Sequence, residues 1–134
     1  MTPENIIRIV SYITSTPVNE ITSKSRMMKV VKPRQLCHYF IRKFVKSYTL
    51  DMVAGLFGGL NHATICHSVK TVDALKKYDK NYQELFLKIE TAIREDINTE
   101  NEELIQLLKE VRADKMDIKK AHDKILLMGI CFLN

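Results

Sequence analysis

Apolar residues recur every three or four positions along almost the whole of this 134-residue chain. That spacing places them on one side of an α-helix, whereas a half-buried strand would alternate apolar and polar residues. No stretch of the sequence alternates in that way. Glycine and proline, which interrupt helices, number only four and three. The pattern therefore predicts an all-α fold.

Capping residues indicate where the helices begin and end. Thr2 precedes Pro3 and a first apolar stripe, and Thr49 and Asn61 stand directly before two later stripes. Proline at a helix start also places the beginning of one helix at Pro33. The expected helices are Thr2–Thr14, a single turn at Val18–Ile21, Pro33–Lys46, Leu50–Phe57 and Asn61–Lys77. The expected inward residues of the last three are Leu36, Cys37, Phe40, Ile41, Phe44 and Val45, then Met52, Val53, Leu56 and Phe57, then Ile65, Val69, Val72 and Leu75.

The pair Gly58-Gly59 separates two of these helices and predicts a helix-turn-helix. Glycine reaches the left-handed conformation easily, so it ends one helix just before Asn61 begins the next. With Ile65 buried, the second helix exposes small or hydrogen-bonding residues and no acid in its first turns. These are His62, Ala63, Thr64, His67 and Lys70. Such a helix start suits the major groove of DNA.

Positive charge is concentrated in the first half of the chain. The net charge is +5, but residues 1–72 hold ten basic and three acidic residues, and residues 73–134 carry a small acidic excess. Between Ser23 and Lys46 there are eight basic residues and no acid. A cluster of one sign favours a polyanion partner such as nucleic acid, although a solvated basic face on an unrelated domain has the same composition.

The last third of the chain predicts two further helices. One has its apolar face from Tyr82 to Ile97 and ends near Asn98, and the other runs from Glu100 to about Met128. In the second, Leu104, Val111, Ile118 and Ile125 stand seven residues apart, which is typical of a helical seam. The two helices either form an antiparallel hairpin or pair with a second chain. A homodimer through these helices is therefore one interpretation, and Asp114 in the seam argues for a monomer.

Other classes of protein fit the sequence poorly. No apolar run approaches the roughly 20 residues that span a bilayer, and the start lacks the layout of a signal peptide, so we expect a cytoplasmic protein without a membrane partner. Three widely spaced cysteines do not suggest disulfides. Cys37-His38 and Cys66-His67 lack the usual spacing of zinc ligands, and both cysteines lie on stripes expected to be buried. We expect no cofactor, no metal and no enzymatic activity.

Four segments of the chain resemble the C-terminal DNA-binding domain of the bacterial replication initiator DnaA. Residues 57–67, FGGLNHATICH, are similar to its signature F-G-G-R-D-H-T-T-V-x-H. Upstream, residues 2–7 resemble the helix that leads into that domain, residues 23–26 its basic loop, and residues 32–35 the start of its next helix. The resemblance implies a Trp-repressor-like helix-turn-helix domain over residues 1–88. The apolar pattern of the last third of the chain adds a C-terminal helical hairpin or tail over residues 80–134.

The resemblance also implies a set of DNA-contacting residues. Arg26 in the basic loop would enter the minor groove, Arg34 and Gln35 would touch DNA from their helix start, and Arg42 would hold phosphate. His62 and Ala63 would meet base edges, and Thr64 would bind phosphate at the helix N-terminus. The full expected set is Lys24, Arg26, Arg34, Gln35, Arg42, Asn61, His62, Ala63, Thr64 and His67.

Two positions depart from that signature. Leu60 replaces an arginine, which removes an expected phosphate contact, and Asn61 replaces an aspartate. A carboxylate accepts a hydrogen bond from cytosine, whereas an amide also donates and pairs with adenine, so a different target sequence is expected. The 134 residues contain no G-x-x-x-x-G-K-[ST] motif, so we expect no nucleotide binding and no complete initiator activity.

The sequence thus predicts a protein that binds specific double-stranded DNA and acts in the replication or regulation of a chromosome or mobile element. The alternative is a protein-interaction module that uses the C-terminal seam and has only non-specific affinity for DNA.

Overall fold

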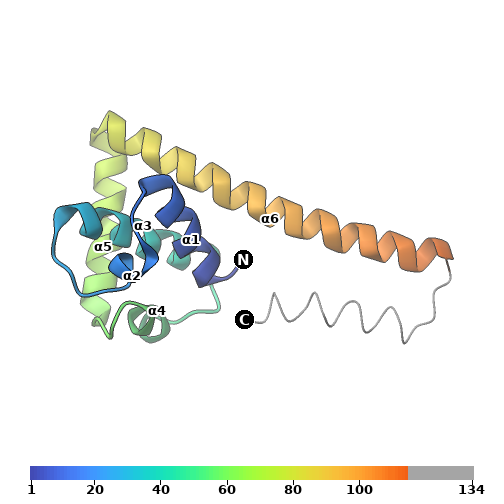
Figure 1. Ribbon diagram of the computed structural model, residues 1–134, viewed down its shortest axis with the longest axis horizontal. Helices are drawn as coiled ribbons and strands as arrows, with labels where there is room; N and C mark the ends of the chain where they lie inside the picture. The colour runs from blue at the N-terminus through green and yellow to red at the C-terminus, as the bar shows by residue number, and fades with distance from the viewer. Residues whose placement is uncertain (115–134) are drawn as a thin grey trace.

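In a computed structural model, residues 1–114 are described, and within that span every regular element is an α-helix. The all-α prediction is therefore confirmed (Figure 1). None of the helices in this span is long and apolar enough to cross a membrane. The predicted seam residues Ile118 and Ile125 lie outside the described residues. The helices are α1 (Pro3–Thr14), α2 (Val18–Ile21), α3 (Met28–Phe44), α4 (Leu50–Leu56), α5 (His62–Tyr78) and α6 (Lys80–Asp114).

The predicted helix caps at Thr2, Thr49 and Asn61 are confirmed. The Asn5 backbone N–H donates to the Thr2 hydroxyl over 3.3 Å, and that of Met52 donates to the Thr49 hydroxyl over 3.2 Å. Each cap satisfies a backbone N–H that has no partner within its own helix. At the end of α1, Ser15 adopts the left-handed conformation that closes a helix.

The predicted start of α3 at Pro33 is wrong, because the helix begins five residues earlier, at Met28. The Met27 carbonyl accepts the backbone N–H groups of Val30 and Val31, and Val30 is buried, which anchors the added turn. Proline in the sixth position removes one helical hydrogen bond, to the Lys29 carbonyl. Burial of Val30 offsets that loss.

The core lies where α1, α3 and α5 meet under the first half of α6. Two predicted inward positions are wrong: Met52 is 46% exposed, and Cys66 on α5 is exposed because it follows the buried Ile65. The other predicted stripes of α3, α4 and α5 are buried or half-buried. Each helix from α1 to α6 contributes fully buried side chains to the core: Ile6, Val10, Ile21, Leu36, Phe40, Ile41, Val53, Ile65, Val72, Ile89 and Ile93.

Helix α6 is one continuous helix, so the predicted break near Asn98 is wrong. Its first half covers the core with Tyr82, Phe86, Ile89 and Ile93, and its second half extends past the other helices (Figure 1). The predicted boundary between two domains near residue 88 thus falls inside a helix whose first turns belong to the core. The seam residue Leu104 is half-buried on the same helix.

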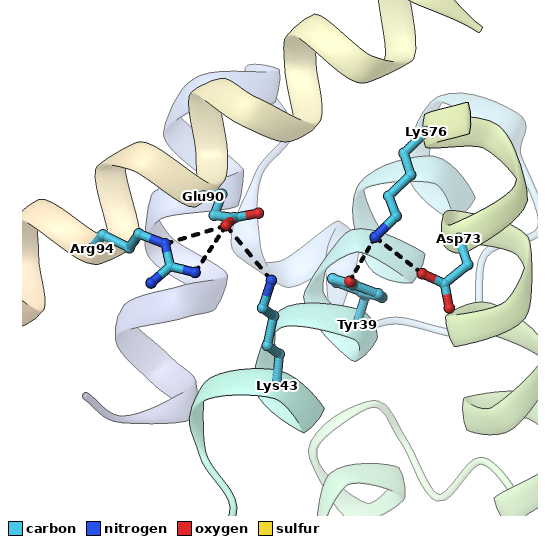
Figure 2. Close-up of polar contacts among 6 residues, drawn as sticks. All are labelled: Tyr39, Lys43, Asp73, Lys76, Glu90 and Arg94. Atoms are coloured by element: carbon cyan, nitrogen blue, oxygen red, sulfur yellow. Dashed lines mark hydrogen bonds and ion pairs between the residues drawn. The ribbon is translucent and has the colours of Figure 1, made fainter. Parts of the chain in front are cut away.

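Polar contacts also hold α6 against the domain (Figure 2). Glu90 of α6 accepts hydrogen bonds from Arg94 and forms an ion pair with Lys43 of α3, with an N–O distance of 3.6 Å. Nearby, the Lys76 ammonium on α5 donates to the Tyr39 hydroxyl over 3.1 Å and pairs with Asp73 at 3.2 Å. These contacts tie α3, α5 and α6 into one unit, which positions the surface of α5 that faces outward.

Candidate nucleic-acid interface

The turn between α4 and α5 depends on two glycines. Gly58 and Gly59 have φ values of +80° and +78°, a conformation that disfavours residues with a Cβ atom. A Cβ atom on Gly58 would also lie 3.4 Å from the Lys24 side chain. The turn therefore packs directly against the loop between α2 and α3, which we call the basic loop (residues 22–27). This contact places the basic loop beside the start of α5.

Asn61 begins α5 through its side chain. Its carboxamide oxygen accepts the Thr64 backbone N–H over 3.0 Å and lies 3.4 Å from the Thr64 hydroxyl. The NH₂ group of Asn61 remains at the exposed end of the side chain, where it can donate to a base or a phosphate. Because the oxygen is used by the cap, the expected two-bond contact to adenine, which needs both ends of the amide, does not fit this geometry.

The start of α5 presents a polar, accessible surface. His62, Ala63, Thr64, His67 and Lys70 are all exposed, as predicted. The His67 ring lies 3.4 Å from the Thr71 hydroxyl, one helical turn further along. The expected DNA-contacting residues of α5 are therefore accessible to a ligand at the first turns of the helix.

One contact at this surface is not predicted by the sequence. The His62 Nε2 atom is hydrogen-bonded to a carboxylate oxygen of Asp51 on α4. Asp51 lies eleven residues before His62, and no motif joins the two positions. The signal in the sequence is weak: a single acid that follows a basic stretch and stands shortly before the glycine pair.

A buried chain of hydrogen bonds supports α5 from beneath. Ser68 donates to the Thr64 carbonyl over 3.0 Å, and the His38 Nδ1 atom lies 2.8 Å from the Ser68 oxygen. Because the Ser68 proton is already used, His38 must donate from Nδ1. Burial, with a smaller contribution from the Arg34 charge, lowers the pKa of His38 from its ordinary 6.5 to about 4. His38 is therefore neutral at neutral pH and links α3 to the first turn of α5.

The basic loop is held in place by Arg34. This side chain is only 7% exposed, and its guanidinium donates to the backbone carbonyls of Ile21 at 2.8 Å, Ser25 at 2.7 Å and Glu20 at 3.4 Å. The expected direct contact of Arg34 with DNA does not fit this placement. Its planar group instead fastens both ends of the segment that carries Lys24. Arg34 is thus a positioning residue.

Most of the predicted positive charge is available at the surface. Of the eight basic residues between Ser23 and Lys46, Arg34 is buried and Lys43 pairs with Glu90. The other six are exposed and form no ion pair with any side chain of residues 1–111: Lys24, Arg26, Lys29, Lys32, Arg42 and Lys46. Charge that no protein carboxylate neutralises remains available to attract phosphate.

The outer parts of this surface include Gln35 and Arg42. Gln35 is half-buried on α3, so only part of its side chain is accessible. Arg42 and Lys70 stand at a shallow groove of about 410 Å³ between α3 and α5, with an apolar floor that includes Leu50 and Val69. The groove lies between two cationic side chains, an arrangement that suits a phosphate backbone passing along α5.

No group of three potential metal ligands occurs within the described part of the chain. Cys37 is buried, and burial raises the pKa of its thiol, so it packs as a small apolar residue. His38 next to it is used by Ser68. The Cys-His pairs of the sequence therefore do not converge on one site in residues 1–114.

Two short-linked helices with a glycine turn, a capped second helix exposed at its N-terminus and an adjoining cationic loop define a helix-turn-helix DNA-binding domain. Comparison with known proteins agrees. Residues 3–72, just over half of the chain, match the family described as bacterial dnaA protein helix-turn-helix. The chain belongs to this family.

Individual relatives also match the chain. The chain is 34% identical over 73 residues to the chromosomal replication initiator protein DnaA of Dechloromonas aromatica, covering 54% of this chain and 16% of the relative. It is 32% identical over 90 residues to that of Thermus thermophilus, covering 67% and 20%, and 33% identical over 82 residues to that of Wolbachia pipientis, covering 61% and 18%. The chain thus matches a fifth or less of the length of these relatives.

Proposed function

We propose that this protein binds specific sequences of double-stranded DNA. In this proposal the first turns of α5 enter the major groove and the basic loop lies over the adjacent minor groove. The observation that carries it is the position of the Lys24 side chain beside Gly58, within 3.4 Å of where a Cβ atom would lie, which places the basic loop next to the turn before α5. Base contacts and backbone contacts are thereby offered from one continuous surface.

Six of the expected DNA-contacting residues have roles that suit their positions. Asn61 donates from its free NH₂ group, and Ala63 offers a methyl group to thymine. Thr64 and Arg42 hold phosphate on either side of α5, and His67 meets the DNA one turn further along. In the basic loop, Arg26 reaches the minor groove, where a guanidinium is attracted to narrow A·T-rich DNA.

The names of the relatives point to the biological process. Those proteins are chromosomal replication initiators, and this chain matches a fifth or less of their length. We propose a role in the replication of a chromosome or mobile element, or in its regulation. In this role the domain of residues 1–88 selects the DNA.

Selection of bound sequences from random duplex DNA tests the proposal. The full chain should enrich a defined motif. The Arg26→Ala variant should bind that motif more weakly and keep the wild-type melting temperature, because Arg26 is exposed. Lys88→Ala is the matched control, since it removes one exposed positive charge on α6, away from the proposed surface. Equal losses in both variants would mean that binding follows net charge alone.

A second candidate function rests on the far half of α6. Ile105 is 51% exposed and Leu108 is 46% exposed, and they lie beside the half-buried seam residues Leu104 and Val111. This helix surface suits pairing with a partner helix, and a homodimer through it would present two DNA-binding domains. Sedimentation equilibrium of the full chain tests this alternative, which requires a species heavier than 15.6 kDa.

A further inference from the structure

We infer that Asp51 determines which base His62 reads, by fixing where the imidazole of His62 carries its proton. This inference rests on the proposed function. The two residues come from the two helices of the helix-turn-helix, Asp51 from the first turn of α4 and His62 from the first position of α5. Their hydrogen bond crosses the glycine turn and joins Nε2 of the ring to the carboxylate.

The chemistry of the pair leaves little choice of proton position. An ionised carboxylate only accepts hydrogen bonds, so Nε2 of His62 must carry the hydrogen and donate it. In the neutral ring the other nitrogen, Nδ1, is then a hydrogen-bond acceptor. Among the side chains described, those of residues 1–111, no group is hydrogen-bonded to that Nδ1 atom. The ring therefore offers a single acceptor at the start of α5.

An acceptor distinguishes the bases of the major groove. Adenine and cytosine present amino groups there, at N6 and N4, whereas guanine and thymine present acceptor oxygens. His62 fixed by Asp51 should therefore favour adenine or cytosine at one position of the target. An unfixed imidazole can place its hydrogen on either nitrogen, and so can also donate to guanine or thymine. Loss of Asp51 should widen the choice of base.

Asp51 should also lower the affinity for DNA of any sequence. Its side chain is 81% exposed beside a surface proposed to meet phosphates, so its negative charge lowers the affinity for every duplex. The two effects separate in experiment. Removal of the carboxylate should raise affinity for random DNA while it reduces discrimination at one position.

Selection of bound sequences by five proteins tests the inference. They are the wild type, Asp51→Ala, His62→Ala, the double variant of these two residues, and Glu20→Ala as the control for charge. Glu20 is exposed at the edge of the basic loop and forms no ion pair with the side chains of residues 1–111. At one position of the motif, the ratio of affinities for adenine or cytosine over guanine or thymine should be roughly 5- to 150-fold smaller in Asp51→Ala than in the wild type. His62→Ala should lose it at the same position, and the double variant should lose no more than His62→Ala. Glu20→Ala should keep the wild-type motif.

Nitrogen-15 NMR of the imidazole in the DNA-free protein, at about pH 8, gives an independent readout. The wild type should show Nε2 of His62 protonated and Nδ1 unprotonated, and Asp51→Ala should show a mixture of the two forms. A proton on Nδ1 in the wild type would overturn the inference, as would an unchanged preferred base in Asp51→Ala. A wild type that selects no motif at all would instead end the proposed function, and this inference with it.

Discussion

His38 lies in the core between α3 and α5 with only 1% of its surface exposed, and its ring stands edge-on to Phe57 at a centroid distance of 4.3 Å. It donates to Ser68 from Nδ1, and its Nε2 atom is buried without a partner among residues 1–114. A proton added to Nε2 would place a positive charge in this apolar site near Arg34. Acid should therefore unfold the protein through this side chain.

The size of the effect follows from the two pKa values. The pKa of His38 is about 4 in the folded protein and 6.5 when the ring is free in water. Because the folded state disfavours the proton, the contribution to stability is complete above pH 6.5 and declines as the pH falls toward 4. At about 1.4 kcal/mol per pH unit, the free energy of unfolding should fall by about 3 kcal/mol by pH 4 from this residue alone.

Urea denaturation of the wild type and of His38→Asn, above pH 6.5 and near pH 4, measures the effect. Asparagine can still donate to Ser68 but does not titrate, and carboxylates such as Glu90 contribute equally in both proteins. The wild type should lose about 3 kcal/mol more than the variant on acidification. An equal loss in the two proteins, or a His38 titration midpoint near 6.5 in the folded state, would refute the reasoning.

Three further predictions concern the turn, the basic loop and the cap. Gly58→Ala should lower the free energy of unfolding by about 1–2 kcal/mol, because the φ of Gly58 is +80°. Gly55→Ala should stabilise the protein, because Gly55 lies inside α4 with open space around it. Equal melting temperatures of the two variants would contradict this prediction. Arg34→Ala should lower the free energy of unfolding by at least about 2 kcal/mol and weaken DNA binding, whereas Arg42→Ala should weaken binding and change stability by less than about 0.5 kcal/mol. Urea denaturation measures the stability and fluorescence anisotropy the binding. An Arg34→Ala variant as stable as the wild type would show that Arg34 does not hold the basic loop in position. Asn61→Asp should keep the helix cap and shift the selected base toward cytosine, while Asn61→Ala should lower the free energy of unfolding by about 1 kcal/mol. An unchanged motif in Asn61→Asp would show that residue 61 contacts no base.

Local signals in the sequence were sufficient for much of the fold. Thr2, Thr49 and Asn61 cap helices through atoms of their own next turn, so the chain segment itself contains all that is needed to predict them. The positive φ values of Gly58 and Gly59 are local in the same sense. These features define the helix-turn-helix, and they were predictable for that reason.

The errors arose where tertiary packing or weak stop signals decide the structure. Pro33 removes one hydrogen bond from α3, and burial of Val30 compensates for that loss. Burial depends on tertiary packing, so the residues near Pro33 do not predict it. Asn98 is only mildly unfavourable in a helix, and nothing near it forces α6 to end.

The same limit applies to the site. The hydrogen-bond partners of Arg34 are backbone carbonyls nine to fourteen residues away in the sequence. Because every residue has a backbone carbonyl, the sequence does not indicate which ones accept from Arg34. The contact between Asp51 and His62 depends on how α4 and α5 cross at the turn, which the spacing of the motif does not specify. The exposure of the first residues of α5 was therefore predictable from the sequence, and the burial of Arg34 and the partner of His62 were not.

The ratio of affinities for a selected duplex and for a shuffled duplex of equal composition tests the central claim most directly. Fluorescence anisotropy of the full chain at physiological ionic strength measures it. Because each base contact contributes about 1–3 kcal/mol, two or three contacts from α5 predict a preference of about thirtyfold or more. Both affinities should fall steeply with added salt as phosphate contacts are lost. Equal affinities for the two duplexes would contradict the account, because they would show a basic surface that binds DNA without reading it.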